Sequence, residues 1–252
     1  MFGYRGAALH RERFLGAVLD DLGWGGNANR PIGELLLVEG RCCQPVGRIS
    51  ALPVPGRDRN AREPWRMAAA VLFVLGETAV PRRLRSSPTA ALLTALRCGL
   101  DCPFMSSANC LFDAAAGLLG VDSPAALEDL ATRHGPEQPL AWGYCLSPDG
   151  ELDFLPLLED LMAVEDVGLG AALFVATLAD GLAEWIVRAS RVHGAQRVAL
   201  WGDCLSSPIL TYWLRSRLDQ AGVETLAASD YTCLARARSG LANRAISEAS
   251  SA

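Results

Sequence analysis

The last third of the sequence alternates apolar runs with helical patterns, and this alternation constrains the fold more than any other feature. RVALWGD at 197–203 is typical of a buried strand, residues 207–220 have helical spacing, VETLAAS is a second strand pattern and 234–247 a last helix. Strand, helix, strand, helix predicts an α/β fold with parallel strands. Ligands bind beyond the carboxyl ends of such strands, so we expect chemistry near Gly202.

The start of the chain predicts an antiparallel hairpin. Two apolar runs, 14–20 and 32–40, flank a glycine-rich turn, and a third run at 45–52 can pair with them. Backbone N–H groups in a turn without side chains can approach an anion, and a carboxylate at a strand tip can hold a metal-bound water. The candidates here are Asp20, Gly23 and Gly25, although a plain structural loop has the same pattern.

Residues from about 62 to 135 are predicted to form an all-helical block. Four helical patterns follow one another with short connections, and the first begins at REPWRM, where Pro64 suits a first helical turn. Arg62 and Arg66 in that motif are either surface charges or groups that hold a carboxylate or phosphate.

The clearest helix is SSANCLFDAAAGLLG, from Ser106 to Gly120. Serine oxygens can cap its first N–H groups, and Gly120 is a typical stop. Asp113 points away from the apolar stripe of this helix at about 100° per residue. The carboxylate therefore lies either on a solvated face or in a cleft.

Composition excludes several classes of protein. The net charge of −5 and the absence of a basic stripe argue against nucleic-acid binding. The N-terminus lacks the apolar core of a secretory signal, and the longest apolar run, 167–179, is too short to cross a bilayer. Eight cysteines occur without a CxxC motif, so we expect free thiols and no zinc or iron site. The sequence predicts a soluble, cytoplasmic protein without a membrane partner.

Several segments, in order along nearly the whole chain, resemble the C-terminal, TsaD-like domain of the HypF carbamoyltransferase family, which serves NiFe-hydrogenase maturation. The hairpin from Asp20 to Glu34 is similar to that family's DGTGYG…WGGE, and residues 52–68 to its LPGGD…REPWRMA. SSANCLFDAAAGLLG is similar to SSxGRLFDAVAALLG. Residues 152–158, 171–183 and 197–203 are similar to its LDFxPLL, AARFHxTLAxxLA and RVALSGG.

The resemblance implies an actin-like ATPase (ASKHA) fold, in which two RNase-H-like lobes close on a nucleotide. This chain then corresponds to one α/β lobe over 1–252, with a helical insertion at about 62–135. By the same resemblance, Asp20, Gly23, Gly25 and Gly202 would contact the nucleotide phosphates or metal, and Asp113 the ribose. The family binds a carbamoyl-adenylate and passes the carbamoyl group to the C-terminal cysteine of HypE.

Departures from the family pattern fall on ligand positions. The family's metal-binding histidines lie upstream of the hairpin, its NDGG motif is replaced by DYTCLARARSG, and its SGG by Trp201, Gly202 and Asp203. These losses place ATP and Mg²⁺ binding in doubt and leave the catalytic residues unknown. They favour a degenerate or accessory homologue that acts by binding a HypE-like partner.

Two other functions stay open. In the first, the chain is an active carbamoyltransferase or nucleotide-binding enzyme that completes its site with a missing N-terminal lobe or by homodimerisation. In the second, an exposed face of the lobe simply forms a homodimer.

Overall fold

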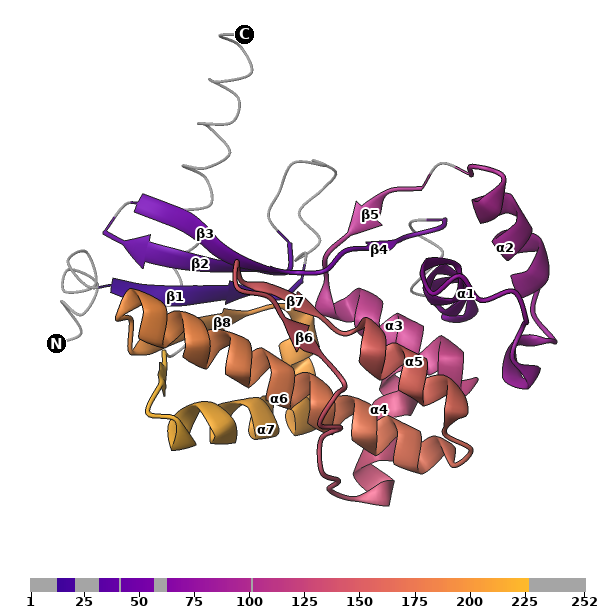
Figure 1. Ribbon diagram of the computed structural model, residues 1–252. Coiled ribbons are helices and arrows are strands. Elements are labelled where there is room, and N and C mark those ends of the chain that lie inside the picture. The colour runs from indigo at the N-terminus through magenta and orange to yellow at the C-terminus, as the bar shows by residue number, and fades with distance from the viewer. Residues whose placement is uncertain (1–12, 21–31, 41, 57–62, 101, 227–252) are drawn as a thin grey trace, which may run out of the picture.

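The computed structural model describes residues 13–20, 32–40, 42–56, 63–100 and 102–226. Its main sheet has seven strands: β1 Arg13–Val18, β2 Glu34–Glu39, β3 Cys42–Ile49, β6 Cys145–Leu146, β7 Glu151–Asp153, β8 Arg197–Trp201 and β9 Glu224–Thr225. They lie in the order β6-β7-β3-β2-β1-β8-β9 (Figure 1). β1, β2 and β3 are antiparallel neighbours, whereas β8 and β9 run parallel to β1. The predicted hairpin and the predicted parallel strands thus belong to one mixed α/β sheet.

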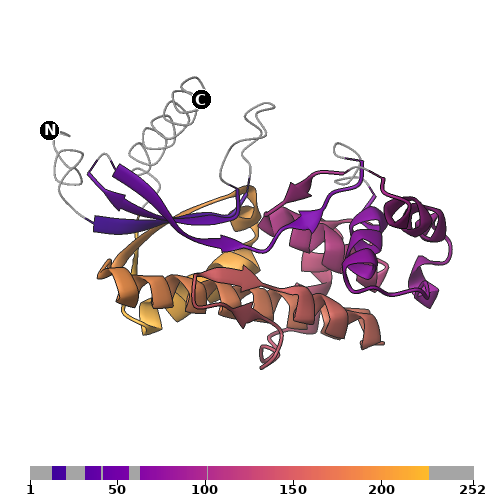
Figure 2. The same ribbon diagram turned by 45° about the horizontal axis from the view of Figure 1, so that its top comes forward.

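Seven α-helices complete the described fold: α1 Trp65–Val74, α2 Thr89–Arg97, α3 Ala108–Leu119, α4 Pro124–His134, α5 Leu155–Ala163, α6 Val167–His193 and α7 Pro208–Gln220. Two short 3₁₀ helices, η3 Arg82–Leu84 and η4 Asp203–Ser206, precede α2 and α7. α6 and α7 lie along one face of the sheet, and α1 and α2 form an arm at its end (Figures 1 and 2).

Helix ends follow the capping residues in the sequence. The Ser107 side chain accepts a hydrogen bond from the Asn109 N–H at the start of α3, and Ser123 and Ser207 cap α4 and α7 in the same way. α3 ends at Gly120, which adopts the left-handed conformation with φ 72°. The helices predicted in this part of the chain are therefore confirmed to within a few residues. The pattern at 234–247 lies outside the described residues.

The segment from 62 to 135 is not all-helical as predicted. Strand β5, Phe104–Met105, pairs antiparallel with β4, Leu52–Pro53, in a second, two-stranded sheet beside α1. The Val54 N–H also donates to the Pro103 carbonyl. The prediction failed because two-residue strands next to proline carry no period-2 pattern.

Both faces of the sheet centre are buried. Leu15, Ala17 and the inner residues of α6 belong to the main hydrophobic core, whereas Phe14, Val38, Ala199 and Leu226 form a second cluster. Burial on both faces explains why β1 and β8 have continuous apolar sequences.

α6 is long and apolar enough to cross a membrane by length and composition, and α3 with α4 pass the same test only as a pair bent by 72°. However, 78% of the apolar window of α6 is buried inside the protein. A mostly buried helix of this kind is typical of a soluble protein's core.

Candidate functional site

The end of β1 meets the start of α3 and η4, and Asp20 connects all three. Its side chain is fully buried. One carboxylate oxygen, Oδ1, accepts hydrogen bonds from Ser107 Oγ at 2.8 Å and from the Asn109 N–H at 2.7 Å. The other, Oδ2, accepts from the Cys204 N–H at 2.9 Å. Asp20 therefore fixes the end of β1 against the starts of α3 and η4.

Gly202 lies directly against this carboxylate, at the carboxyl end of β8. Its φ of 148° and ψ of 150° belong to a region that is almost restricted to glycine. A Cβ atom here would lie 3.0 Å from Asp20 Oδ2 and 3.1 Å from the Asp20 amide nitrogen. The structure thus brings together two predicted site residues that are far apart in the sequence.

An open hollow of about 380 Å³ adjoins Gly202. Apolar side chains and Trp201 form part of its wall, and the polar groups are two hydroxyls and one guanidinium. The lining residues are Leu200, Trp201, Gly202, Leu205, Ser206, Thr211 and Arg215. Asp203, the residue after Gly202, is exposed beside it.

Asp113 is buried in α3, one helical turn after Asn109, and only 9% of its surface is exposed. The interpretation of this carboxylate as part of a solvated face is therefore wrong. α3 is covered by α1, α4, α5 and α6 on its several sides, so most of the Asp113 side chain is buried, while its carboxylate oxygens keep some contact with solvent. Within the described residues no group donates a hydrogen bond to Asp113, and burial raises the pKa of its carboxyl group to about 7.

Cys110 lies between the two buried carboxylates. Burial, together with the charges of Asp113 and Asp20, raises the pKa of its thiol to about 12, although a hydrogen bond with Ser107 acts in the opposite direction. This thiol is therefore protonated at neutral pH and is a poor nucleophile. The seven described cysteines are all free.

Arg66 follows the start of α1, which packs closely on α3. A Cβ atom at Gly117 would lie 2.2 Å from the Pro64 carbonyl oxygen, so glycine permits this approach. Arg66 forms an ion pair with Glu63 at 2.6 Å, and its guanidinium lies 4.6 Å from the ring centroid of Trp65. Its charge is thus already balanced by a neighbour. Gly23, Gly25 and Arg62 lie outside the described residues.

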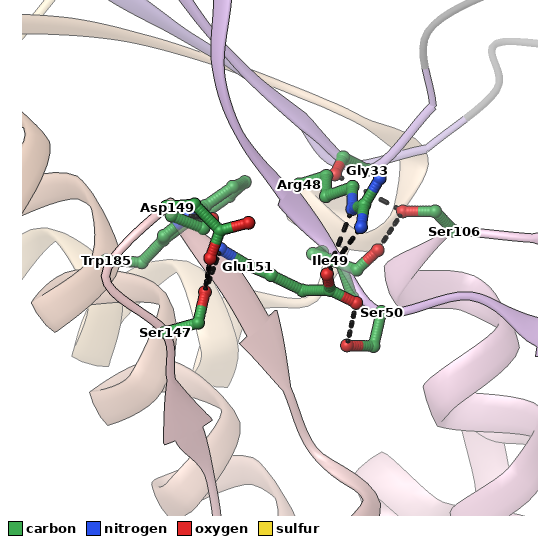
Figure 3. Close-up of polar contacts among 10 residues, drawn as sticks. Gly33, Arg48, Ile49, Ser50, Ser106, Ser147, Asp149, Glu151 and Trp185 are labelled. Carbon is green, nitrogen blue, oxygen red and sulfur yellow. Dashed lines mark hydrogen bonds and ion pairs between the residues drawn. The ribbon is translucent and has the colours of Figure 1, made fainter.

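Ser106 has a role that the sequence did not reveal. Its hydroxyl hydrogen-bonds to the Ile49 carbonyl at 2.5 Å, and Gly33, with φ 65°, packs against the same side chain (Figure 3). In the same view Arg48 and Ser50 bind the Glu151 carboxylate, which connects β3 to β7. A serine before a helix was interpreted only as a cap, and no sequence signal indicates its strand partners.

Residues 16–234 match the family profile described as "Carbamoyltransferase, Kae1-like Domain, second subdomain". A "Carbamoyltransferase HypF homolog" from Cupriavidus necator is 38% identical over 247 residues, which cover 88% of this chain and 62% of that protein. The chain belongs to the HypF carbamoyltransferase family.

A second relative from the same organism, "Carbamoyltransferase HypF2", is 36% identical over 86% of this chain and 31% of its own length. The chain thus spans less than two thirds of either HypF relative. Two solved structures have a similar fold. Full-length HypF in its phosphate- and nucleotide-bound form has a TM-score of 0.72 at 20% identity, covering 93% of this chain and 40% of that one. T. kodakarensis HypF has a TM-score of 0.68 at 22% identity, covering 85% and 31%.

Metal ligands do not gather in the part of this HypF-like chain that the structure describes. No three His, Cys, Asp or Glu side chains converge there as a metal site requires. His10 and the turn at 21–31 lie outside that part, so the expectation of no zinc or iron stays a prediction.

Proposed function

We propose that this chain is the nucleotide-binding lobe of a HypF-type carbamoyltransferase in hydrogenase maturation, and that it works with a facing lobe. The family membership supports the reaction class. The sheet supports the finer fold, because β3-β2-β1-β8-β9 with β8 and β9 parallel to β1 is the strand order of an RNase-H-like lobe of the ASKHA type. Residues 1–252 then form this single lobe, and about 62–135 its insertion.

The observation that carries the proposal is the carboxylate of Asp113, which is mostly buried, accepts no hydrogen bond from the described residues and keeps its oxygens partly open to solvent. Burial without a hydrogen bond raises the free energy of the folded state at neutral pH. Groups with such raised pKa values concentrate at functional sites. A ribose hydroxyl would donate the missing hydrogen bond, in line with the role that the resemblance implies for Asp113.

ATP fits the described residues better than Mg²⁺ does. Asp113 can accept a hydrogen bond from a ribose. The hollow beside Gly202, which Asp113 does not line, has a guanidinium, that of Arg215, suited to a phosphate. The nucleotide would supply activation of the carbamoyl group. The described residues offer no converging ligands for Mg²⁺, so the proposal gives the metal no role in the reaction.

The proposed partners are a facing lobe and a HypE-like carbamoyl acceptor, all in the cytoplasm. The facing lobe is either a separate N-terminal chain or a second copy. Neither nucleic acid nor a membrane enters the proposal.

An accessory, degenerate role is the second candidate, and Asp20 favours it. All three hydrogen bonds to this carboxylate come from the protein, so Asp20 is already occupied where a phosphate- or metal-binding role was expected. Trp201 and the exposed Asp203 add bulk and negative charge beside Gly202.

A complementation assay separates these candidates. The chain is mixed with the separately produced N-terminal part of Cupriavidus necator HypF2, and ATP turnover that depends on carbamoyl phosphate is measured. We expect turnover from the mixture, none from either chain alone, and at least a tenfold lower rate with Asp113→Ala. A silent mixture that still binds a HypE protein would support the accessory role.

A further inference from the structure

The hollow beside Gly202 borders an unpaired stretch of sheet edge. β9 pairs only with the first two residues of β8, Arg197 and Val198. The last hydrogen bond between the two strands joins the Leu226 N–H to the Val198 carbonyl at 2.8 Å. β8 continues to Trp201, so its final residues have no neighbouring strand on the β9 side among the described residues.

Leu200 is the residue whose backbone faces this open side. In a parallel strand, the N–H and C=O of one residue point to one neighbouring strand, and those of the next residue point to the other. The Trp201 carbonyl accepts from the Leu19 N–H, directly after β1, at 2.7 Å. The N–H and C=O of Leu200 therefore point to the β9 side. No described residue forms a hydrogen bond with either group.

The unpaired groups of Leu200 are also nearly without water. Only 2% of this residue is exposed, and its side chain belongs to the main core. A backbone donor and acceptor that are buried without partners are rare, because each costs free energy comparable to a lost hydrogen bond. The wall of the hollow therefore contains a donor and an acceptor that a ligand can satisfy.

Arg215 of α7 lines the same hollow and adds a positive charge. It is the only charged side chain among the described lining residues, and it has no hydrogen-bond or ion-pair partner among the described residues. The exposed carboxylates of Asp203, after Gly202, and of Asp219, one turn beyond Arg215, do not line the hollow. The hollow thus combines one guanidinium with the unpaired N–H and C=O of Leu200.

A carbamoyl group matches the two backbone groups. The N–H and C=O of one extended residue lie side by side on the same edge of the strand. A carbamoyl group is planar and has a carbonyl acceptor next to an NH₂ donor, as the side-chain amides of Asn and Gln have. It can therefore accept from the Leu200 N–H and donate to the Leu200 carbonyl at the same time. A phosphoryl group attached to it is a typical partner for the guanidinium of Arg215.

We propose that the backbone of Leu200 binds the carbamoyl group of the substrate, and that Arg215 binds the phosphoryl group attached to it. The inference rests on the proposed function, which supplies the carbamoyl group. The pairing makes the hollow selective for carbamoyl over acyl phosphates. An acetyl group has a methyl in place of the NH₂ donor, so it leaves the Leu200 carbonyl unpaired.

The test uses the full chain with ¹³C at leucine carbonyls and ¹⁵N at tryptophan. Leu200 is the only leucine that a tryptophan follows in the sequence, so a single carbonyl resonance reports on it. We expect carbamoyl phosphate to shift this resonance. Acetyl phosphate should bind about tenfold more weakly and leave it in place, because one hydrogen bond is missing. Inorganic phosphate, which can contact Arg215 alone, should leave it in place too.

A substitution of Arg215 tests the phosphoryl contact. Arg215→Met is expected to weaken carbamoyl phosphate binding about tenfold, because it removes a charge-assisted contact. Arg191→Met is the matched control, because Arg191 is exposed on α6 and does not line the hollow. Its affinity should stay within twofold of the unchanged chain.

Three results would overturn the inference: an unmoved Leu200 carbonyl resonance at millimolar carbamoyl phosphate, affinities for carbamoyl and acetyl phosphate within twofold, or Arg215→Met that binds as the unchanged chain does. Slow hydrogen exchange of the Leu200 N–H in the free chain would also overturn it, because the edge would then already be paired. Turnover is not measured in this experiment. A shifted Leu200 resonance together with a silent complementation assay would refute the proposed function and leave the carbamoyl contact in place.

Discussion

Asp20 and Asp113 are two buried carboxylates at the same junction, and their surroundings are opposite. Asp20 accepts three hydrogen bonds from the starts of α3 and η4, whereas Asp113, one turn further along α3, accepts none within the described residues. A buried carboxylate with three protein donors stabilises the arrangement around it, whereas a mostly buried one without a protein donor lowers stability when it is ionised. We therefore assign Asp20 to structure and Asp113 to ligand binding.

Removal of the satisfied carboxylate should have the largest effect. Asp20→Ala leaves the Cys204 N–H and the Ser107 hydroxyl without their acceptor and the Asn109 N–H with only Ser107 Oγ, and we expect it to lower the free energy of unfolding by about 3 kcal/mol. Urea denaturation measures this change. Asp203→Ala, at an exposed neighbouring position, is the control and should change stability little. Equal losses of unfolding free energy for the two substitutions would contradict the assignment of Asp20 to structure.

Gly202→Ala tests the structural role of Asp20 through the residue that packs against its carboxylate. It combines an unfavourable backbone conformation with a Cβ atom close to Asp20, and we expect a loss of about 3 kcal/mol. Gly222→Ala is the matched control, because Gly222 also has positive φ but has no atom within 4 Å of its Cβ position. The difference between the two losses, measured by denaturation, combines the close contacts with Asp20 and Leu19 and the greater backbone strain at Gly202. Equal losses in the two variants would mean that the neighbours of Gly202 can move to accept a Cβ atom at little cost.

Asp113→Asn should stabilise the protein, in contrast to Asp20→Ala. In the unfolded chain the carboxyl group ionises with its ordinary pKa near 4, whereas in the folded chain its pKa is about 7. Its contribution to stability is therefore full below pH 4 and is lost as the pH rises to 7. We expect a gain of about 2 kcal/mol at pH 8 and none at pH 3.

Denaturation at several pH values tests this dependence. Asp160→Asn, at an exposed position of α5, is the control and should show no such gain. A variant Asp113→Asn that is less stable than the unchanged chain at pH 8 would mean that this carboxylate has a structural partner.

Arg66→Met should have the smallest effect. Arg66 is paired with Glu63 and covers Trp65, so the substitution removes a partly exposed ion pair of about 1 kcal/mol or less. We also expect ATP affinity to change less than twofold in equilibrium titrations. A tenfold loss of affinity would restore the alternative that Arg66 holds an anion.

Local features were predictable from the sequence because they depend on neighbouring residues. Ser107 and Gly120 define the ends of α3, and the alternating pattern from 197 onward gave β8 and α7. Contacts between distant segments were not predictable. The helical period placed Asp113 opposite the apolar stripe but did not reveal that other helices cover that side too. Likewise, nothing in the sequence indicated that Asp20 would bind the Cys204 N–H.

Calorimetric titration of the purified chain with ATP and Mg²⁺, repeated with ADP, tests the central claim most directly. If Asp113 is held in the structure for a nucleotide, the chain binds with micromolar affinity, and Asp113→Ala weakens binding at least tenfold while the fold is retained. No heat up to millimolar nucleotide, or equal affinities of the two proteins, would contradict the account.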